Sequence, residues 1–182
     1  QDLIHTHTMI ADSKSGVSGA GRSLSLATHF CEVNESFCAY KIGNHRHTPE
    51  INEILTQHAG LPVDLTFTPH LLPLTRGMLS TIYVTAKKNV GAKKIRNAYD
   101  AYYKKEPFVR VLENNAYPAI SHVKGTNRCD FGFHHNERTQ QIIIISAIDN
   151  LLKGAAGQAI QNMNIMFNLP DETGLNTVQA PL

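Results

Sequence analysis

The sequence predicts an α+β fold, a mixed and largely antiparallel sheet with helices on one face. Two observations support this expectation. Segments in which apolar and polar residues alternate, the pattern of β-strands, outnumber segments with helical spacing. The strand-like segments also follow one another closely along the chain, and the helical segments are inserted singly between them.

Size and composition indicate one domain, residues 1–182, large enough to bury a core. Its hydrophobic content of 42% and charged content of 18% are ordinary for a globular protein. The net charge of +2 favours neither nucleic acid nor a membrane as partner. No apolar run approaches the length of a transmembrane span. Three cysteines, an odd number in no paired pattern, predict reduced thiols in a cytoplasmic protein.

The first elements of the chain are short. We expect a strand over residues 3–10, a glycine- and serine-rich loop over 13–22, a short helix over 24–30 and a strand over 37–42. In the loop, Gly16, Gly19 and Gly21 leave backbone N–H groups unhindered, and Arg22 adds a fixed positive charge. This composition is typical of an anion-binding loop and equally of a flexible surface loop.

Residues 43–51 place two imidazoles, a guanidinium and a carboxylate where a strand ends and a helix begins. Thr48 is the expected N-cap and Pro49 the first helical residue, where its missing N–H is no loss. Gly60 is expected to end the helix as a left-handed cap. Side chains at such a junction project into a cleft, and the helix N-terminus there favours anions.

The two histidines of this junction are the candidate acid–base residues. His45 and His47 are two apart, so on an extended backbone they point the same way, with Arg46 opposite. One imidazole could be the base, the other could orient it, and Glu50 could fix a tautomer. From the pattern alone, solvated histidines or a metal pair are the alternatives.

The three cysteines are not expected to be nucleophiles. Cys38 falls within an alternating strand, and Cys129 begins another. Cys31 is close in sequence to Glu32 and Glu35, which would raise the pKa of its thiol. All three are therefore interpreted as structural residues.

The second half of the chain is predicted to complete the sheet. Strands are expected over 63–69, 78–86, 108–112, 129–134 and 141–147, with a loop over 70–76 and an amphipathic helix over 89–105. The last helix is expected over 151–167, capped by Asn150. Its first turns are glycine and alanine, which are useful if another surface approaches closely, although close packing on the sheet would need the same residues.

Four motifs, in this order along the chain, resemble those of one family. They are Ser-Gly-Val-Ser-Gly-Ala-Gly-Arg at 15–22, His-Arg-His-Thr-Pro-Glu-Ile-Asn at 45–52, Phe-Thr-Pro-His at 67–70 with Arg76-Gly77, and Ala-Ile-Asp-Asn-Leu-Leu-Lys-Gly-Ala-Ala-Gly at 147–157. They are similar to motifs of the N-acetyl-γ-glutamyl-phosphate reductases, NADPH-dependent enzymes of arginine biosynthesis. The resemblance covers nearly the whole chain.

The resemblance implies the catalytic and dimerisation domain of a glyceraldehyde-3-phosphate-dehydrogenase-like enzyme. Such an enzyme reduces the acyl phosphate N-acetyl-glutamyl phosphate to a semialdehyde through a cysteine thioester. The family's NADP-binding domain and its Pro-Gly-Cys-Tyr segment are absent from this sequence, so the chain alone is expected to be inactive. The last helix, 151–167, is expected to pack on the absent domain.

The resemblance also suggests roles for individual residues. His47 is the favoured base, with His45 binding substrate and Glu50 orienting, although the choice between the histidines is close to even. The substrate contacts implied are Ser15, Gly16, Ser18, Arg22, Arg46 and Arg76, those on the cofactor side are Asn150 and Gly154, and no metal is expected. The expected assembly is a homodimer or homotetramer. The alternatives are a dimerisation module without catalysis and a histidine-cluster metal-binding domain.

Overall fold

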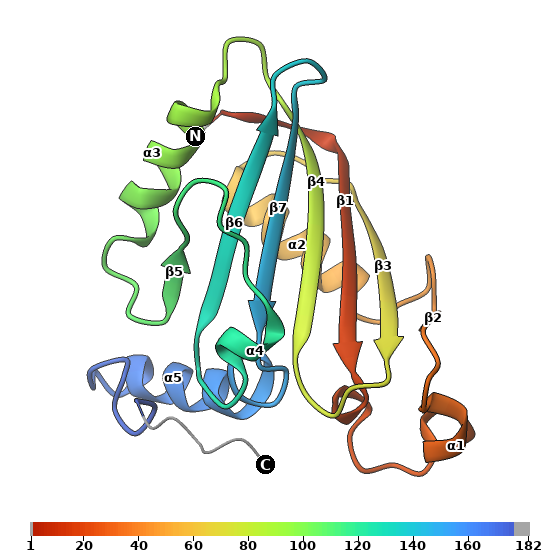
Figure 1. Ribbon diagram of the computed structural model, residues 1–182. Coiled ribbons are helices and arrows are strands. Elements are labelled where there is room, and N and C mark those ends of the chain that lie inside the picture. Colours follow the sequence, from red (N-terminus) through yellow and green to blue (C-terminus); the bar gives the residue numbers. More distant parts are fainter. Residues whose placement is uncertain (1, 177–182) are drawn as a thin grey trace.

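The computed structural model describes residues 2–176 and shows one seven-stranded mixed sheet (Figure 1). The strand order is β2-β3-β1-β4-β7-β6-β5. The strands are β1 (Ile4–Gly16), β2 (Cys38–Ala39), β3 (Leu65–Leu72), β4 (Met78–Ala86), β5 (Val109–Val111), β6 (Cys129–Asn136) and β7 (Gln141–Ile148). Only β1 with β3 and β5 with β6 pair in parallel, which confirms the predicted largely antiparallel sheet.

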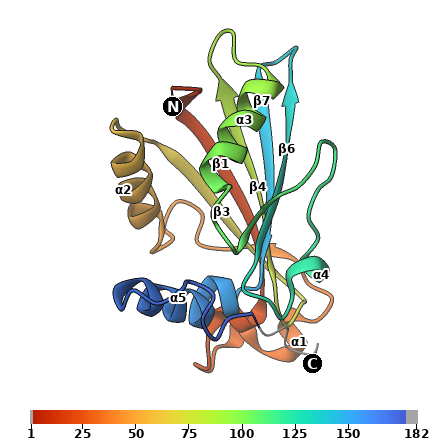
Figure 2. The ribbon, with the colours of Figure 1, turned by 90° about the vertical axis from the view of Figure 1, so that its left-hand side faces the viewer.

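The helices surround this sheet. They are the 3₁₀ turns η1 (Val17–Ala20) and η2 (Leu26–Thr28), the helices α1 (Phe30–Val33), α2 (Thr48–Ala59), α3 (Ala92–Tyr103) and α4 (Ile120–Val123), the π-helix η3 (Leu152–Ala156) and α5 (Gly157–Met166). Figure 2 shows α2 and α3 on one face, α4 toward the other, and α5 below the strands. None of the helices described between residues 2 and 176 is long and apolar enough to cross a membrane.

The core lies between the middle strands and the helices α2 and α3. Val84, Ile142 and Ile95 are each at most 3% exposed and belong to one cluster with residues of β1 and the segment before β3. Because burial of one such side chain contributes roughly 1.5–3 kcal/mol, this cluster fixes α3 to the sheet. The β6–β7 hairpin and strand β4 occur as the sequence predicts.

The boundaries of four predicted elements are wrong. Strand β1 continues through residues 13–16, which were assigned to the glycine-rich loop. Strand β3 does not end at Pro69 but runs to Leu72, because Pro69 lies beside the two-residue edge strand β2 and uses only its carbonyl, which accepts the Tyr40 N–H. The expected strand 37–42 shrinks to β2, and the expected helix 24–30 is divided between η2 and α1.

The last helix starts with a π-turn rather than an α-turn. The N–H of Gly154 donates to the carbonyl of Asp149 at 3.0 Å, and that of Ala156 donates to Leu151 at 2.9 Å. A Cβ at Gly157 would lie 2.2 Å from Oδ1 of the buried Asn127. The glycine at 157 is thus explained by close packing within the domain.

Candidate functional site

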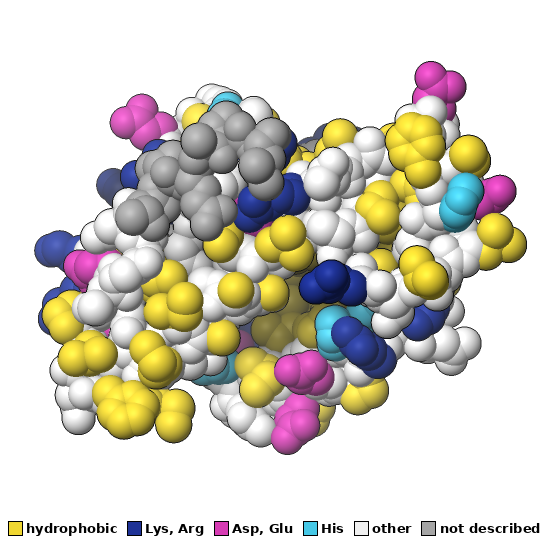
Figure 3. Space-filling view, turned by 90° about the horizontal axis from the view of Figure 1, so that it is seen from below, with side chains coloured by type: hydrophobic (Ala, Val, Ile, Leu, Met, Phe, Trp, Pro, Cys, Tyr) yellow, Lys and Arg dark blue, Asp and Glu magenta, His cyan; other side chains and the backbone are white. Residues whose placement is uncertain are grey.

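An apolar groove with a volume of about 730 Å³ lies over the helix-covered face of the sheet. Strands β1, β4 and β7 form its floor, and α2 and α3 form its walls. Its lining includes Ile51 and Leu55 from α2 and Tyr99 from α3. Seen from below, Figure 3 shows an apolar hollow with histidine, basic and acidic side chains around its mouth.

A row of serines crosses the floor of the groove near this mouth. Ser13, Ser80 and Ser146 are direct partners in the registers of β1, β4 and β7, and all three line the groove. The hydroxyls of Ser13 and Ser80 are hydrogen-bonded at 2.7 Å. The next row toward the top is apolar, with Ala11, Ile82 and Ile144 at the same positions.

His45 and His47 lie together at the start of α2. Residues 45–47 form a turn rather than the extended segment expected, yet the two rings are in edge-to-face contact with centroids 5.0 Å apart. His47 is the N-cap with helical dihedral angles, one residue earlier than predicted, and the Thr48 hydroxyl has no hydrogen-bond partner. Gly60 ends the helix in the left-handed region with φ of 69°, as predicted.

The surroundings of His45 favour the neutral form of its imidazole. Its ring packs against Tyr40 and Phe67, with centroids 5.7 and 5.1 Å away, as well as against His47. Burial, together with the nearby His47, Lys41 and Arg46, lowers the pKa of His45. Its Nδ1 accepts the backbone N–H of His47 at 3.3 Å, which leaves the ring proton on Nε2. A neutral ring of this tautomer is a hydrogen-bond donor.

His47 has a different environment. It is exposed and lines the groove, and within residues 2–176 its imidazole has no hydrogen bond or ion pair. Arg46 and Glu50 are also exposed, and in the same range neither forms an ion pair. Glu50 lies in the first turn of α2 but makes no hydrogen bond to either described histidine. The ring nitrogens of His47 are therefore available to a ligand.

Contrary to the prediction, backbone N–H groups at the start of the glycine-rich segment are not free. The N–H groups of Gly16, Val17 and Ser18 donate to the carbonyls of Gly77, Leu74 and Thr75 at 2.9, 2.8 and 3.3 Å. Gly16 is required because an added Cβ would lie 2.8 Å from the Leu74 carbonyl oxygen. These three N–H groups are therefore not available to an anion, and the candidate anion-binding groups are side chains.

These side chains are the hydroxyls of Ser15 and Ser18 and the guanidinium of Arg22. The Ser15 hydroxyl donates to the carbonyl of Gly16 at 3.2 Å. Arg22 is exposed beside Ser18 in a shallow hollow, and none of the ion pairs of residues 2–176 includes it. Arg22 is thus a cation whose charge is not compensated within the described chain.

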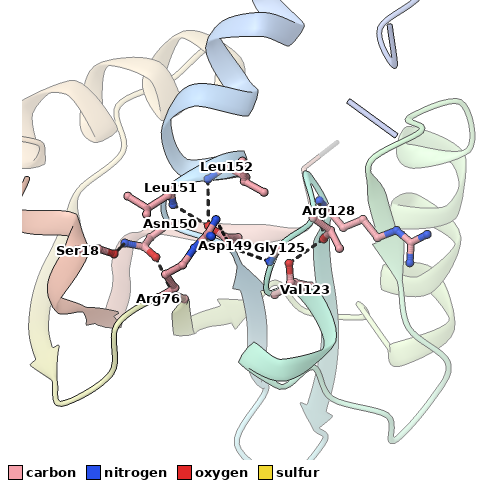
Figure 4. A network of polar contacts seen from close by, with 11 residues as sticks. Ser18, Arg76, Val123, Gly125, Arg128, Asp149, Asn150, Leu151 and Leu152 are labelled. Carbon is pink, nitrogen blue, oxygen red and sulfur yellow. Dashed lines mark hydrogen bonds and ion pairs between the residues drawn. The ribbon is translucent and has the colours of Figure 1, made fainter. Parts of the chain in front are cut away.

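Arg76 is engaged inside the domain (Figure 4). Its guanidinium lies 2.9 Å from a carboxylate oxygen of Asp149, which is 0% exposed. Asp149 also accepts the N–H groups of Gly125, Leu151 and Leu152 at 2.8, 2.9 and 3.1 Å. The carboxylate thereby joins the β3–β4 connection, the segment after α4 and the start of η3.

Asn150 joins the same centre to the glycine-rich segment. Its side-chain oxygen accepts the N–H of Gly77 at 2.6 Å, and its side-chain nitrogen donates to the Ser18 hydroxyl at 2.9 Å (Figure 4). One hydrogen on the amide nitrogen and one lone pair on the amide oxygen remain for a further hydrogen bond. Gly154, four residues further along, is exposed at the start of the last helix, as are Ala155 and Ala156.

Replacing Asn150 by alanine should loosen the glycine-rich segment. The change removes both side-chain bonds, and we expect a loss of roughly 1–3 kcal/mol in the free energy of unfolding, since each neutral hydrogen bond contributes about 0.5–1.5 kcal/mol. Hydrogen exchange measured by mass spectrometry should become faster over residues 17–22. Ser18→Ala, which removes only one of the bonds, is the control and should show about half the loss. Unchanged exchange in Asn150→Ala would contradict this role.

Neither the serine row nor the Asp149 centre was found from the sequence. Each of the three serines lies in a different strand, and only the register of the sheet places them side by side. Asp149 lies within one of the quoted motifs, but nothing local shows that its partners come from residues 76 and 125. Of the cysteines, Cys31 and Cys38 are exposed and Cys129 is partly buried, with a thiol pKa raised by burial.

The fold and this site define a domain of the semialdehyde dehydrogenase class. The chain matches the family described as the semialdehyde dehydrogenase dimerisation domain over residues 1–150, and it belongs to that family. The fold of the chain resembles that of aspartate semialdehyde dehydrogenase II of Vibrio cholerae, with a TM-score of 0.70 at 13% identity over 90% of this chain and 55% of that one. A probable aspartate-semialdehyde dehydrogenase of Pseudomonas aeruginosa gives 0.67 at 14% identity, over 91% and 57%.

Within this family, the sequence relatives are N-acetyl-γ-glutamyl-phosphate reductases. The protein of Desulforapulum autotrophicum is 60% identical over 99% of this chain and 52% of its own length. That of Pelotomaculum thermopropionicum is 57% identical over 95% and 50%. The chain thus spans about half the length of these relatives, and its predicted resemblance to this family is confirmed.

Proposed function

We propose that this domain is the substrate-binding and dimerisation half of an N-acetyl-γ-glutamyl-phosphate reductase. The observation that carries the proposal is the pair of imidazoles at the mouth of the groove, in a chain 60% identical to such a reductase. In the reaction, a cysteine thiolate outside this chain attacks the acyl phosphate, and phosphate leaves as the thioester forms. Addition of a hydride to the thioester carbonyl then releases the semialdehyde and restores the thiolate.

The two histidines divide the acid–base work in this proposal. His47 takes the proton of the thiol, because its ring nitrogens are exposed and have no partner in the described chain. His45, whose neutral form is favoured by its partial burial, donates its Nε2 hydrogen to a substrate oxygen. Glu50 acts through charge at the helix N-terminus, since it does not hydrogen-bond either ring in the structure.

Anionic groups of the substrate are proposed to meet side chains rather than backbone. Arg22 and Arg46 are exposed and lack ion-pair partners within residues 2–176, and the Ser15 and Ser18 hydroxyls lie on the segment that leads to Arg22. Gly16 contributes by letting this segment approach the β3–β4 connection. Arg76, whose charge is compensated by Asp149, supports the site through this ion pair.

The residues proposed for the cofactor side would make a small part of the contacts with NADP. Asn150 keeps one amide hydrogen and one oxygen lone pair, and the exposed glycine and alanines at 154–156 leave a surface without long side chains. When bound, NADPH would supply the hydride. The rest of its binding site is proposed to lie on the nucleotide domain of the full-length protein.

Helix α5 is proposed to face that second domain, because its amphipathic pattern is inverted. The residues it buries are Gly157, Gln161 and Asn164. Apolar side chains point outward instead, with Met163 46% exposed, Met166 78% and the adjoining Phe167 71%. An apolar stripe of this kind on a helix indicates a covering partner.

Self-association is proposed to use the sheet face opposite α2 and α3. Figure 2 shows the middle strands uncovered on that side. Tyr83, Ile143 and Ile145 are only partly buried there, and Ile10 is 43% exposed. The family description as a dimerisation domain supports a homodimer or homotetramer of this face. The reaction and the free cysteines suit a cytoplasmic enzyme.

The metal-binding alternative has no support in the described residues, because no group of three histidine, cysteine, aspartate or glutamate side chains within 2–176 is arranged to hold an ion.

The reductase proposal is tested by the oxidation of NADPH by the full-length protein. N-acetyl-glutamyl phosphate should be reduced, and β-aspartyl phosphate should be reduced poorly. The 182-residue chain alone should show no turnover. Preference for the aspartyl substrate would overturn the proposal.

Arg22→Gln in the full-length protein should weaken substrate binding. Loss of one charge-assisted contact to an anion costs about 1.5–3 kcal/mol, so KM should rise roughly ten- to a hundredfold while kcat changes less. Arg138→Gln, in the exposed β6–β7 turn, removes the same charge far from the site and is the control. A KM that stays unchanged in Arg22→Gln would remove Arg22 from the site.

A further inference from the structure

Three aromatic rings lie against the imidazole of His45. Tyr40, His47 and Phe67 each meet it edge to face, with interplanar angles of 69°, 69° and 67°. We infer that Tyr40 is a positioning residue for His45, and that its ring rather than its hydroxyl holds the imidazole in the orientation used for the substrate. The inference deepens the proposed function and rests on the role proposed there for His45.

The chain between Tyr40 and His45 folds back in a tight turn that brings the two rings together. The N–H of Asn44 donates to the carbonyl of Lys41 at 3.0 Å, and Lys41 and Gly43 both have a positive φ, of 47° and 72°. A lysine rarely adopts this conformation without support from the surrounding structure. The turn places His45 against Tyr40, and the contact between the two rings supports the turn.

The edge of the sheet fixes Tyr40 from the other side. Tyr40 directly follows β2, and its N–H donates to the carbonyl of Pro69 in β3 at 3.1 Å. Phe67, two residues before Pro69 on the same strand, supplies a second ring against His45. Because both rings are anchored to β3, the sheet sets the position of the imidazole together with the turn that carries it.

This packing determines what each nitrogen of His45 can do. Nδ1 accepts the N–H of His47, whereas Nε2 has no hydrogen-bond partner within residues 2–176 and stays accessible. Rotation of the side chain into solvent would break the bond at Nδ1 and move Nε2 from its position. An edge-to-face contact favours the packed orientation roughly two- to tenfold. The Tyr40 ring therefore keeps the Nε2 hydrogen where a substrate oxygen can accept it.

The same packing affects the protonation of His45. The charged groups that act on it are Lys41 and Arg46, together with the imidazole of His47, while β3 faces it with an aromatic ring. Partial burial is the largest cause of its lowered pKa, and these groups add to it. Since the Tyr40 ring supplies part of that burial, its loss should hydrate the imidazole and raise the pKa of His45.

Titration of His45 by NMR tests the inference without any measurement of activity. In the full-length protein labelled in its histidine rings, the signals of His45 are those missing from His45→Gln. In Tyr40→Leu, which replaces the ring by an apolar side chain, the pKa of His45 should rise toward the ordinary value of about 6.5. In Tyr40→Phe, which keeps the ring, it should stay close to that of the unaltered protein. An unchanged titration in Tyr40→Leu would overturn the inference.

The rate of NADPH oxidation by the same full-length proteins measures the consequence for the reaction. Tyr40→Leu should lower kcat/KM roughly two- to tenfold, and Tyr40→Phe should recover most of this loss. In a His45→Gln background, Tyr40→Leu should have little further effect, because a positioning residue acts only through the group that it holds. A loss of equal size in that background, or in Tyr40→Phe, would overturn the inference. If the full-length protein did not reduce the substrate, the proposed reaction would fall, and the titration would still decide the role of Tyr40.

Discussion

His47→Gln in the full-length protein is expected to lower kcat by about 10²–10⁴-fold with little change in KM, the usual contribution of a positioned general base. The expectation rests on the exposed imidazole of His47 at the mouth of the groove and on the absence of any partner for that ring within residues 2–176. The measurement is the rate of NADPH oxidation at saturating substrate, with circular dichroism to show that the fold is retained.

His45→Gln is the matched variant and should have the smaller effect on kcat. Burial and the neighbouring cations lower the pKa of His45, so it stays neutral to a lower pH than an ordinary histidine. The loss of rate on acidification should therefore persist in His45→Gln. If it instead vanished in His45→Gln, the roles of the two histidines would be exchanged.

Asp149→Ala is expected to cause the largest loss of stability of any substitution considered. The carboxylate is 0% exposed and serves three backbone N–H groups and Arg76. Removing it leaves a guanidinium that is only 11% exposed without its partner. Breaking such a buried pair costs about 3–5 kcal/mol, which corresponds to a fall in Tm of roughly 10 °C. Urea unfolding at pH 7 measures the change.

The control for Asp149→Ala is an exposed ion pair. Asp100 lies four residues after Arg96 on α3 at 2.8 Å, with nearly half of the Asp100 side chain exposed. Asp100→Ala should cost no more than about 0.5 kcal/mol, because solvent screens such pairs. Equal losses in the two variants would show that Asp149 is an ordinary surface carboxylate in energetic terms.

The acid stability of the domain should also depend on Asp149. Burial by itself would raise the pKa of this carboxyl, but the N–H groups of Gly125, Leu151 and Leu152 and the Arg76 guanidinium together lower it. A lowered folded-state pKa adds stability that is complete above the ordinary carboxyl pKa of about 3.9 and is lost as the pH falls through the folded value. Asp149→Asn, which cannot ionise, should show a smaller drop in stability between pH 5 and pH 3.

Local patterns predicted the fold class because they report on single elements. Alternation identified β4 and the β6–β7 hairpin, and a proline followed by a glycine eleven residues later marked most of α2. The same patterns failed at β3, where the sequence suggested an end at Pro69 and the sheet continues to Leu72. That proline is tolerated because it lies beside the short edge strand β2, a fact of strand order that no local pattern contains.

The candidate site shows the same division. By itself the sequence determined that His45, His47 and Arg46 gather at a helix start, because residues so close along the chain must lie close in space. Only the tertiary structure decided that His45 packs against Phe67, and that Arg76 meets Asp149 across 73 positions of chain. The register of β1, β4 and β7, set by pairing between distant segments, alone aligned the three serines. Spacing fixes neighbours along one element, whereas contacts between elements depend on how the whole sheet is ordered.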